Sequence, residues 1–185
     1  METNVPRRPM HLRRIEMQAW LRDDGLWDIE AHLRDEKPFD YIDPGRGLRP
    51  AGAPVHDLRV RLTVDDDRIV RDVAVQMDSV PFGTCHEVKE SLRPLIGERV
   101  GRGWRRVLKK IPRHATCAHV HEVLMPMATV AHQGMSLGRD PAGKVSLEPD
   151  PTLTEAPFFV DDCHSWRIDG PVVVHFFPKL ARPRE

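Results

Sequence analysis

The sequence predicts an α+β fold, an antiparallel sheet of hairpins with helices on one face. Alternating apolar residues occur in pairs of segments joined by turn signals, which is typical of β-hairpins with one buried face. Segments with helical spacing follow these strands instead of alternating with them, so a parallel sheet of βαβ units is not expected. The 185 residues are 40 % hydrophobic and 30 % charged, a composition that suits one globular domain.

The first hairpin is predicted over 15–35. Apolar residues alternate along 15–21 and again along 27–33, and Arg22-Asp23-Asp24-Gly25 separates the two runs. This tetrapeptide is a turn signal, because glycine tolerates positive φ. The following segment, 38–54, is rich in Gly and Pro and is interpreted as a connector.

The second hairpin is predicted from two further alternating runs, 55–64 and 69–77, with Asp65-Asp66-Asp67 as the turn. In the first of these runs, His56 shares the parity of the apolar residues. A polar imidazole at the beginning of the apolar face of a strand needs a partner there. The parity of His56 therefore marks it as a candidate functional residue.

Three helical segments are expected after the hairpins. Thr84 and Glu87 have the spacing of a capping box ahead of a helix that ends near Gly97. A short basic helix is expected within 101–110, and a longer one begins near Thr116, with a kink at Pro126.

The C-terminal part of the chain has a weaker pattern. The segment 134–157 is rich in Gly, Pro and Asp and is expected to be a flexible loop, and two apolar runs in 158–180 predict a last β-ribbon. Residues 1–12 are polar and expected to be disordered. The sequence thus predicts a single α+β domain over 13–180.

Charge and composition exclude several classes of function. The 28 Lys and Arg residues balance the 28 Asp and Glu residues, which argues against nucleic-acid binding and against an anionic membrane surface. The chain has no apolar run of membrane-spanning length and no apolar leader segment, so the cytoplasm is expected. Three cysteines are too few for a disulfide framework and are expected to be reduced.

Two cysteines and one histidine are predicted to form a metal site. Cys85 and Cys117 each follow a threonine placed to start a helix, where the helix dipole stabilises the thiolate that binds metal. Together with His56 they make a His/Cys/Cys set, with His119 as a metal ligand or general base and His121 in the same alternative roles. Zinc is the expected ion, and iron is the alternative.

Each of these residues also has a plain structural interpretation. A free cysteine is commonly a small buried hydrophobic residue, and a lone histidine is often a satisfied core residue. Sulfur nucleophiles are a further alternative, with Cys117 beside His121 or Cys163 beside His164. No C-x-x-C pair decides between these alternatives.

A set of motifs is distributed over the chain from about Arg13 to Pro178. These motifs are Asp23-Asp24-Gly25-Leu26-Trp27-Asp28-Ile29-Glu30, Val55-His56-Asp57-Leu58, Leu62-Thr63-Val64-Asp65-Asp66-Asp67, Gly103-Trp104-Arg105-Arg106, Cys117-Ala118-His119, Asp162-Cys163-His164 and Asp169-Gly170-Pro171-Val172-Val173. As a set they resemble an uncharacterised bacterial family, DUF family 2889. The resemblance implies an association with the catabolism of aromatic compounds, including lyases that release formaldehyde from lignin-derived dimers.

In the order of its elements, the chain is also similar to U-type iron–sulfur cluster scaffolds. By this resemblance His56, Cys85 and Cys117 stand at the three cysteine positions of a scaffold, and Asp57 stands near the acidic one. The histidine at the first position departs from the scaffold pattern. This histidine favours a catalytic metal ion that stays bound over an iron–sulfur cluster that is transferred to another protein.

These observations predict a metal-dependent enzyme, a lyase or hydrolase that acts on a small aromatic, lignin-derived compound. His119, His121 and His164 are its candidate acid–base groups, and Arg167 is the candidate clamp for a carboxylate or phenolate. The alternative is a non-catalytic metal or iron–sulfur carrier that binds protein partners. The oligomeric state stays open, a homodimer included.

Overall fold

The computed structural model describes residues 4–136, 149–157 and 159–182. The chain divides into two compact units, with the boundary between residues 139 and 140. The sequence analysis expected one domain over 13–180 and did not indicate this division. Each unit is therefore described by itself.

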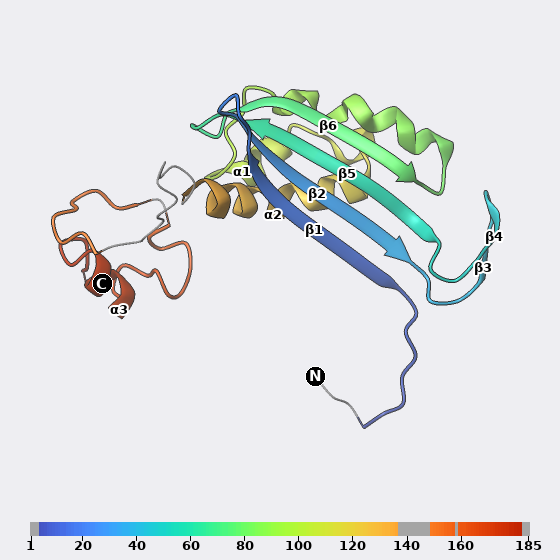
Figure 1. The fold of residues 1–185 in the computed structure, drawn as a ribbon, viewed down its shortest axis with the longest axis horizontal. Coiled ribbons are helices and arrows are strands. Elements are labelled where there is room, and N and C mark those ends of the chain that lie inside the picture. The colour runs from blue at the N-terminus through green and yellow to red at the C-terminus, as the bar shows by residue number, and fades with distance from the viewer. Residues whose placement is uncertain (1–3, 137–148, 158, 183–185) are drawn as a thin grey trace. The chain divides into compact units, whose positions relative to one another are not determined.

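The first unit is built on a four-stranded antiparallel sheet with the strand order β1-β2-β5-β6 (Figure 1). The predicted α+β class with an antiparallel sheet of two hairpins is thereby confirmed. The two hairpins lie side by side because β2 pairs with β5. The strands are β1 (Leu12–Leu21), β2 (Trp27–Glu36), β5 (Pro54–Val64) and β6 (Val70–Ser79).

The turns of both hairpins lie where the sequence placed them. Gly25 has a φ of 83°, and its N–H donates to the carbonyl of Arg22 at 3.0 Å. In the second turn the N–H of Arg68 donates to the carbonyl of Asp65 at 2.8 Å. Since β1 begins at Leu12, the end of the segment predicted to be disordered belongs to the folded unit.

The connector 38–54 contains a small hairpin that the sequence analysis did not predict. Strands β3 (Tyr41–Asp43) and β4 (Gly47–Arg49) pair with each other. Each has three residues, too few to show an alternating pattern. The guanidinium of Arg46 donates to the carboxylate of Asp43 at 2.7 Å and to the carbonyl of Val55 at 3.2 Å, so the connector is fixed to β5.

The helices of this unit pack on one face of the sheet, α2 against β1 and β2, and η1 against β6 (Figure 1). The largest fully buried side chains include Leu33 and Leu58 from the sheet, with Leu95 and Leu124 from the helices. The helical segments are η1 (Gly83–Leu95), α1 (Trp104–Leu108), η2 (Arg113–Ala115) and α2 (Ala118–Ser136).

The predicted capping box at Thr84 and Glu87 is wrong. The segment is a 3₁₀ helix whose N-cap is Phe82, without a side-chain cap. The N–H of Cys85 donates to the carbonyl of Phe82 at 3.1 Å, so the first turn closes with Thr84 inside it. A capping threonine has to stand before the first turn, where its hydroxyl oxygen accepts a hydrogen bond from a free backbone N–H of that turn. Thr84 lies inside the turn and cannot do this.

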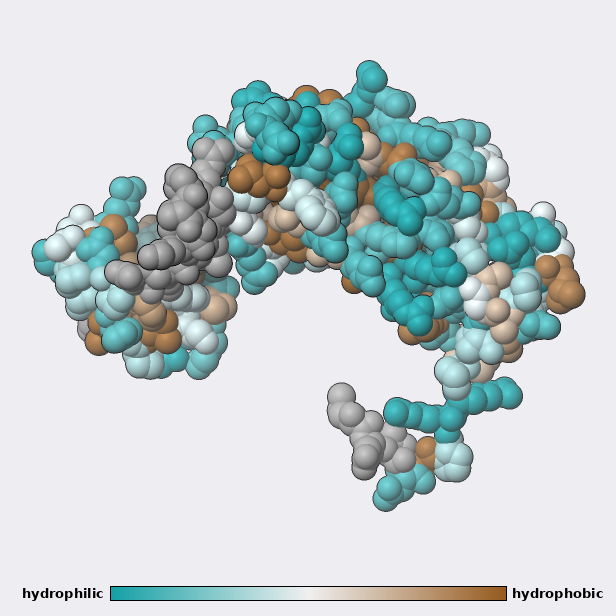
Figure 2. Space-filling view, viewed as in Figure 1, coloured by the Kyte–Doolittle hydropathy of each residue, from teal (hydrophilic) through white to brown (hydrophobic). Residues whose placement is uncertain are grey.

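The opposite face of the sheet is polar. Figure 2 shows mostly hydrophilic side chains over the sheet. Polar contacts connect neighbouring strands, as in the hydrogen bond between His32 and Asp57 at 2.7 Å and the ion pair between Arg61 and Asp72 at 3.2 Å. The two faces thus follow the period-two pattern that the sequence displays.

Helix α2 lies close to strand β1 at Gly134. A Cβ atom added at this glycine would lie 2.6 Å from the Cβ of Ala19. We expect Gly134→Ala to push the helix from the strand and to lower the free energy of unfolding by about 1–3 kcal/mol, the range for overpacking. Urea denaturation followed by circular dichroism measures this change. Gly83→Ala, which meets no atom within 4 Å, is the matched control, and an equal effect of both variants would contradict the close approach.

The second unit has no sheet among its described residues, so the predicted β-ribbon over 158–180 is wrong. It contains helix α3 (Pro171–Phe176), with Pro171 at the first helical position, where a missing N–H costs nothing. The ring of Trp166 lies 4.7 Å from that of Phe159 and 5.6 Å from that of Phe176.

Helix α2 continues to Ser136, into the beginning of the predicted loop 134–157, and residues 137–148 of that loop lie outside the described residues. Among the helices that the structure describes, none combines the length and the apolar character that a membrane span requires.

Candidate metal centre

The apolar face of the sheet ends in a row of polar residues. The strand register places Arg13 of β1 opposite Asp35 of β2, and Asp35 opposite His56 of β5. In the neighbouring row, Leu33 lies opposite Leu58 and both are fully buried. The side chain of Asp35 is only 1 % exposed. A carboxylate buried at this depth needs hydrogen bonds and a compensating charge.

Arg13 supplies most of that compensation. Its Nε donates to Oδ1 of Asp35 at 2.7 Å and its Nη2 donates to Oδ2 at 2.8 Å, a bidentate pair. The third nitrogen, Nη1, donates to Glu122 of α2 at 2.5 Å. Arg13 therefore connects the buried carboxylate to the helix. His11 completes the set, with Nε2 3.2 Å from Oδ1 of Asp35.

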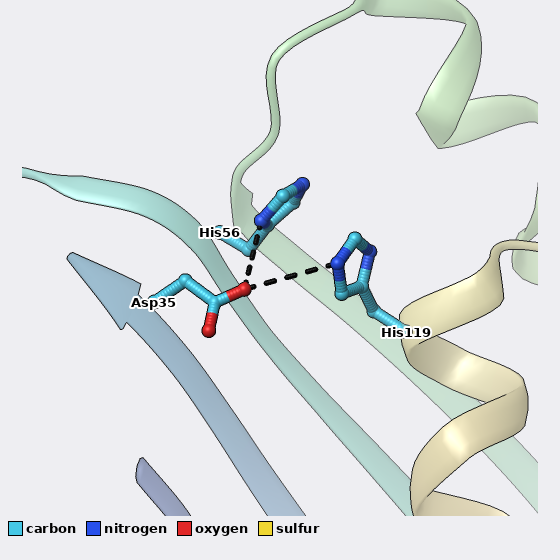
Figure 3. Close-up of side chains that lie close together, drawn as sticks. All are labelled: Asp35, His56 and His119. Atoms are coloured by element: carbon cyan, nitrogen blue, oxygen red, sulfur yellow. Dashed lines mark hydrogen bonds and ion pairs between the residues drawn. The ribbon is translucent and has the colours of Figure 1, made fainter. Parts of the chain in front are cut away.

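Two histidines converge on the other carboxylate oxygen of Asp35 (Figure 3). Nδ1 of His56 lies 3.0 Å from Oδ2, and Nε2 of His119 lies 3.8 Å from it. The two imidazole rings are 3.8 Å apart between centroids, at an angle of 34°. One ligand atom from each of the three residues lies within 4.8 Å of the other two.

The ionisation of these groups suits a cation. Burial alone raises the pKa of Asp35, but the hydrogen bonds and charge of Arg13, with smaller contributions from His56 and His11, outweigh it and hold the pKa at about 2. Burial and the neighbouring His119 lower the pKa of His56 below its usual 6.5. At neutral pH Asp35 is ionised and His56 is neutral, the forms that bind metal.

The spacing of the donor atoms approaches that of a metal site: Nδ1 of His56 is 3.0 Å from Oδ2 of Asp35, whereas Nε2 of His119, at 3.8 Å, would have to move closer on metal binding. Zinc and iron are bound by nitrogen and oxygen at about 2.0–2.2 Å, which places neighbouring ligand atoms roughly 3–3.5 Å apart. Asp35 has about four lone-pair sites, of which Arg13 uses two and His11 one. An ion would replace the proton that His56 donates to the fourth, and the other hydrogen bonds would hold the carboxylate in place.

Two of the residues that the sequence analysis assigned to a metal site, His56 and His119, meet here. Cys117 lies at the edge of the group, with Sγ 3.6 Å from Nδ1 of His119. Burial raises the pKa of the Cys117 thiol, but its hydrogen bonds with His119 and with the N–H groups of Val120 and His119 outweigh this and lower the pKa. The direction is the one that the helix-start argument predicts.

The other assigned residues lie elsewhere. Cys85 is half-buried in η1 and packs against the hydrophobic core, outside the Asp35, His56 and His119 group. His121 lies in a groove beside α1. His164 and Arg167 belong to the second unit, where Nη1 of Arg167 is 3.1 Å from Nε2 of His164. Cys163 is exposed in the same unit.

Sequence reasoning missed Asp35, although a signal was present. The residue continues the parity of Trp27, Ile29, Ala31 and Leu33, all of which are buried. An aspartate at the end of an apolar parity, like His56 in the next hairpin, is a polar group on the core face. Taken together, the apolar parity of Asp35 and that of His56 would have indicated a polar site on the core face of the sheet.

A comparison with protein families finds one model, described as a protein of unknown function (DUF2889), that matches residues 11–133. The matched range contains His11, Arg13, Asp35, His56 and His119 and ends before the motifs around Cys163 and Gly170. Neither the curated proteins nor the solved structures provide a significant match. The resemblance to U-type scaffolds therefore stays a prediction.

Proposed function

The chain belongs to the DUF2889 family, whose function is unknown, and from the geometry of the site we propose that the protein is a metal-dependent enzyme. Asp35, His56 and His119 hold a divalent ion, zinc or iron(II). The observation that carries this proposal is the convergence of Nδ1 of His56 and Nε2 of His119 on Oδ2 of a buried, ionised carboxylate.

Two histidines and one carboxylate are a recurrent ligand set for catalytic iron(II) and, with glutamate as the carboxylate, for catalytic zinc. Three protein ligands leave coordination positions for water and substrate. The bound ion would supply Lewis acidity, polarising a substrate oxygen or activating water. The proposed reactions are those of a lyase or hydrolase, as the sequence analysis expected.

The surrounding residues have separate tasks in this proposal. Arg13 and His11 hold Oδ1 of Asp35, so the carboxylate keeps its orientation when Oδ2 binds the ion. Cys117 contacts Nδ1 of His119 and thereby directs Nε2 toward Asp35. The aromatic, lignin-derived substrate is supported by the family resemblance alone.

A metal-free acid–base site is the second candidate, and the bidentate Arg13–Asp35 pair favours it. Arg13 already neutralises Asp35, which reduces the attraction of the site for a cation. Asp35 would then orient the neutral imidazole of His56 as a proton acceptor. A carrier of iron–sulfur clusters has less support, since Cys85 lies outside the group and cluster ligands are mainly thiolates.

The test is to supply the full chain with zinc or iron(II) under reducing conditions, measure bound metal by mass spectrometry, and assay lignin-derived dimers for formaldehyde release. We expect about one equivalent of metal and turnover that a chelator abolishes. Absence of stoichiometric metal would refute the metal centre. Turnover that persists in the chelator would support the acid–base site, and transfer of metal to an apo-acceptor without turnover would support a carrier.

A further inference from the structure

A second candidate binding site lies in the same unit, in a groove of about 470 Å³ between α1, residues 109–113 and α2. Its floor is apolar, with Leu108 and Ile111 almost fully buried and Met125 half-buried. This volume lies in the range of small-molecule sites.

Three cations surround the apolar floor, namely Arg105, Lys109 and Arg113. All three are exposed, and no carboxylate lines the groove. The contrast with the sheet is clear, because arginines such as Arg34 and Arg61 are there paired with aspartates. None of the three groove cations forms an ion pair within residues 4–136, 149–157 and 159–182.

The groove and the metal centre lie on different flanks of α2. His119 faces Asp35 and His56, whereas His121 lines the groove. Two residues along an α-helix correspond to a rotation of about 200°. A molecule in the groove therefore does not need the metal ligands.

We propose that this groove binds a small organic anion, a carboxylate on an apolar and preferably aromatic body. The apolar floor would bury the body of the molecule, and the unpaired cations would bind its carboxylate. Arginine suits both parts, because its guanidinium binds carboxylates in a bidentate manner and stacks on aromatic rings. This site is independent of the proposed enzymatic reaction and would stand if the metal centre failed its test.

The experiment titrates naphthalene-2-carboxylate into the ¹⁵N-labelled full chain and follows the backbone amides by NMR. We expect shifts that cluster within 105–125. The double variant Arg105→Gln/Arg113→Gln should weaken binding by about tenfold or more, since it removes two of the three cations that line the groove. The matched control Arg71→Gln/Arg93→Gln, which removes two exposed arginines outside the groove, should leave the affinity unchanged.

Further probes separate the alternatives. The affinity for the neutral naphthalene-2-carboxamide should be lower than that for the carboxylate by at least about tenfold. The variant His56→Ala should bind the carboxylate as the parent protein does. Equal affinity for the amide, or shifts elsewhere in the chain, would overturn the proposal. So would a preference for phosphatidylserine vesicles or a glutamate-rich peptide, which would identify the groove as a membrane or protein contact. Loss of binding in His56→Ala would assign the anion to the metal centre.

Discussion

Replacing His56 by alanine is expected to remove stoichiometric metal from the protein, with an affinity loss of more than about 100-fold. Substituting a residue that only orients a ligand already costs 10–100-fold in metal affinity, and His56 is one of three proposed ligands. The variant leaves Asp35 with its bidentate Arg13 partner, so the fold is expected to persist. Metal content by mass spectrometry and secondary structure by circular dichroism measure the two expectations.

The matched controls for His56→Ala are Cys85→Ala and His121→Ala. Both residues were candidates on sequence grounds, and both lie outside the group of converging donors. We expect these two variants to retain metal at the level of the parent protein. The opposite pattern, with metal lost in Cys85→Ala and kept in His56→Ala, would reject the Asp35, His56 and His119 centre and return a cysteine site to consideration.

Replacing Asp35 by asparagine is expected to lower the free energy of unfolding by about 3 kcal/mol. The side chain is 1 % exposed and accepts from Arg13, His11 and His56, so the variant leaves Arg13 beside an uncharged amide. The expected cost lies at the lower end of the range for a broken buried pair, because Arg13 also donates to Glu122. Urea denaturation in the presence of a chelator measures it without a contribution from bound metal.

The effect of Asp35→Asn is expected to depend on pH in a definite direction. The pKa of Asp35 is about 2, below the value of about 3.9 for an unfolded aspartate. Its ionic contribution to stability is therefore present above pH 4 and is lost as the pH falls from about 4 to about 2. The difference in stability between the parent protein and Asp35→Asn should shrink over this window.

Asp72→Asn is the control for this prediction. Asp72 pairs with Arg61 at 3.2 Å but is exposed, and the removal of such a surface pair costs about 1 kcal/mol or less. If Asp35→Asn were as mild as Asp72→Asn, or if its effect did not change between pH 6 and pH 2, the buried network would not have the role assigned to it.

The two hairpins could be predicted because their signals are local. Alternation along β1, β2, β5 and β6 reports one buried face, and Gly25 reports its turn within four residues of chain. The same local pattern found His56, a polar residue with apolar parity. The β-ribbon predicted over 158–180 was wrong because a continuous run of valines fits a strand and a helix equally well. Pro171, at the first helical position, favours the helix that the structure contains.

The candidate site could be predicted only in part, because it joins residues that are distant in the chain. Asp35 and His56 become neighbours through the pairing of β2 with β5 across the connector, and His119 reaches them because α2 packs on the same face. No periodicity reports which strand of one hairpin pairs with which strand of another. The residues that signal the start of a helix likewise do not indicate whether Cys117 or His119 faces the sheet.

What the sequence by itself determined is the α+β class, the two hairpins and the presence of His56 on the core face, because each depends on the spacing of neighbouring residues. Only the tertiary structure decided that Asp35 joins His56 and His119, that Cys117 stands at the edge of this group and that Cys85 packs against the core outside it. The physical reason is that a buried carboxylate has to be satisfied wherever the packing places it. Its partners then come from every element that meets at that point, here β1, β5 and α2.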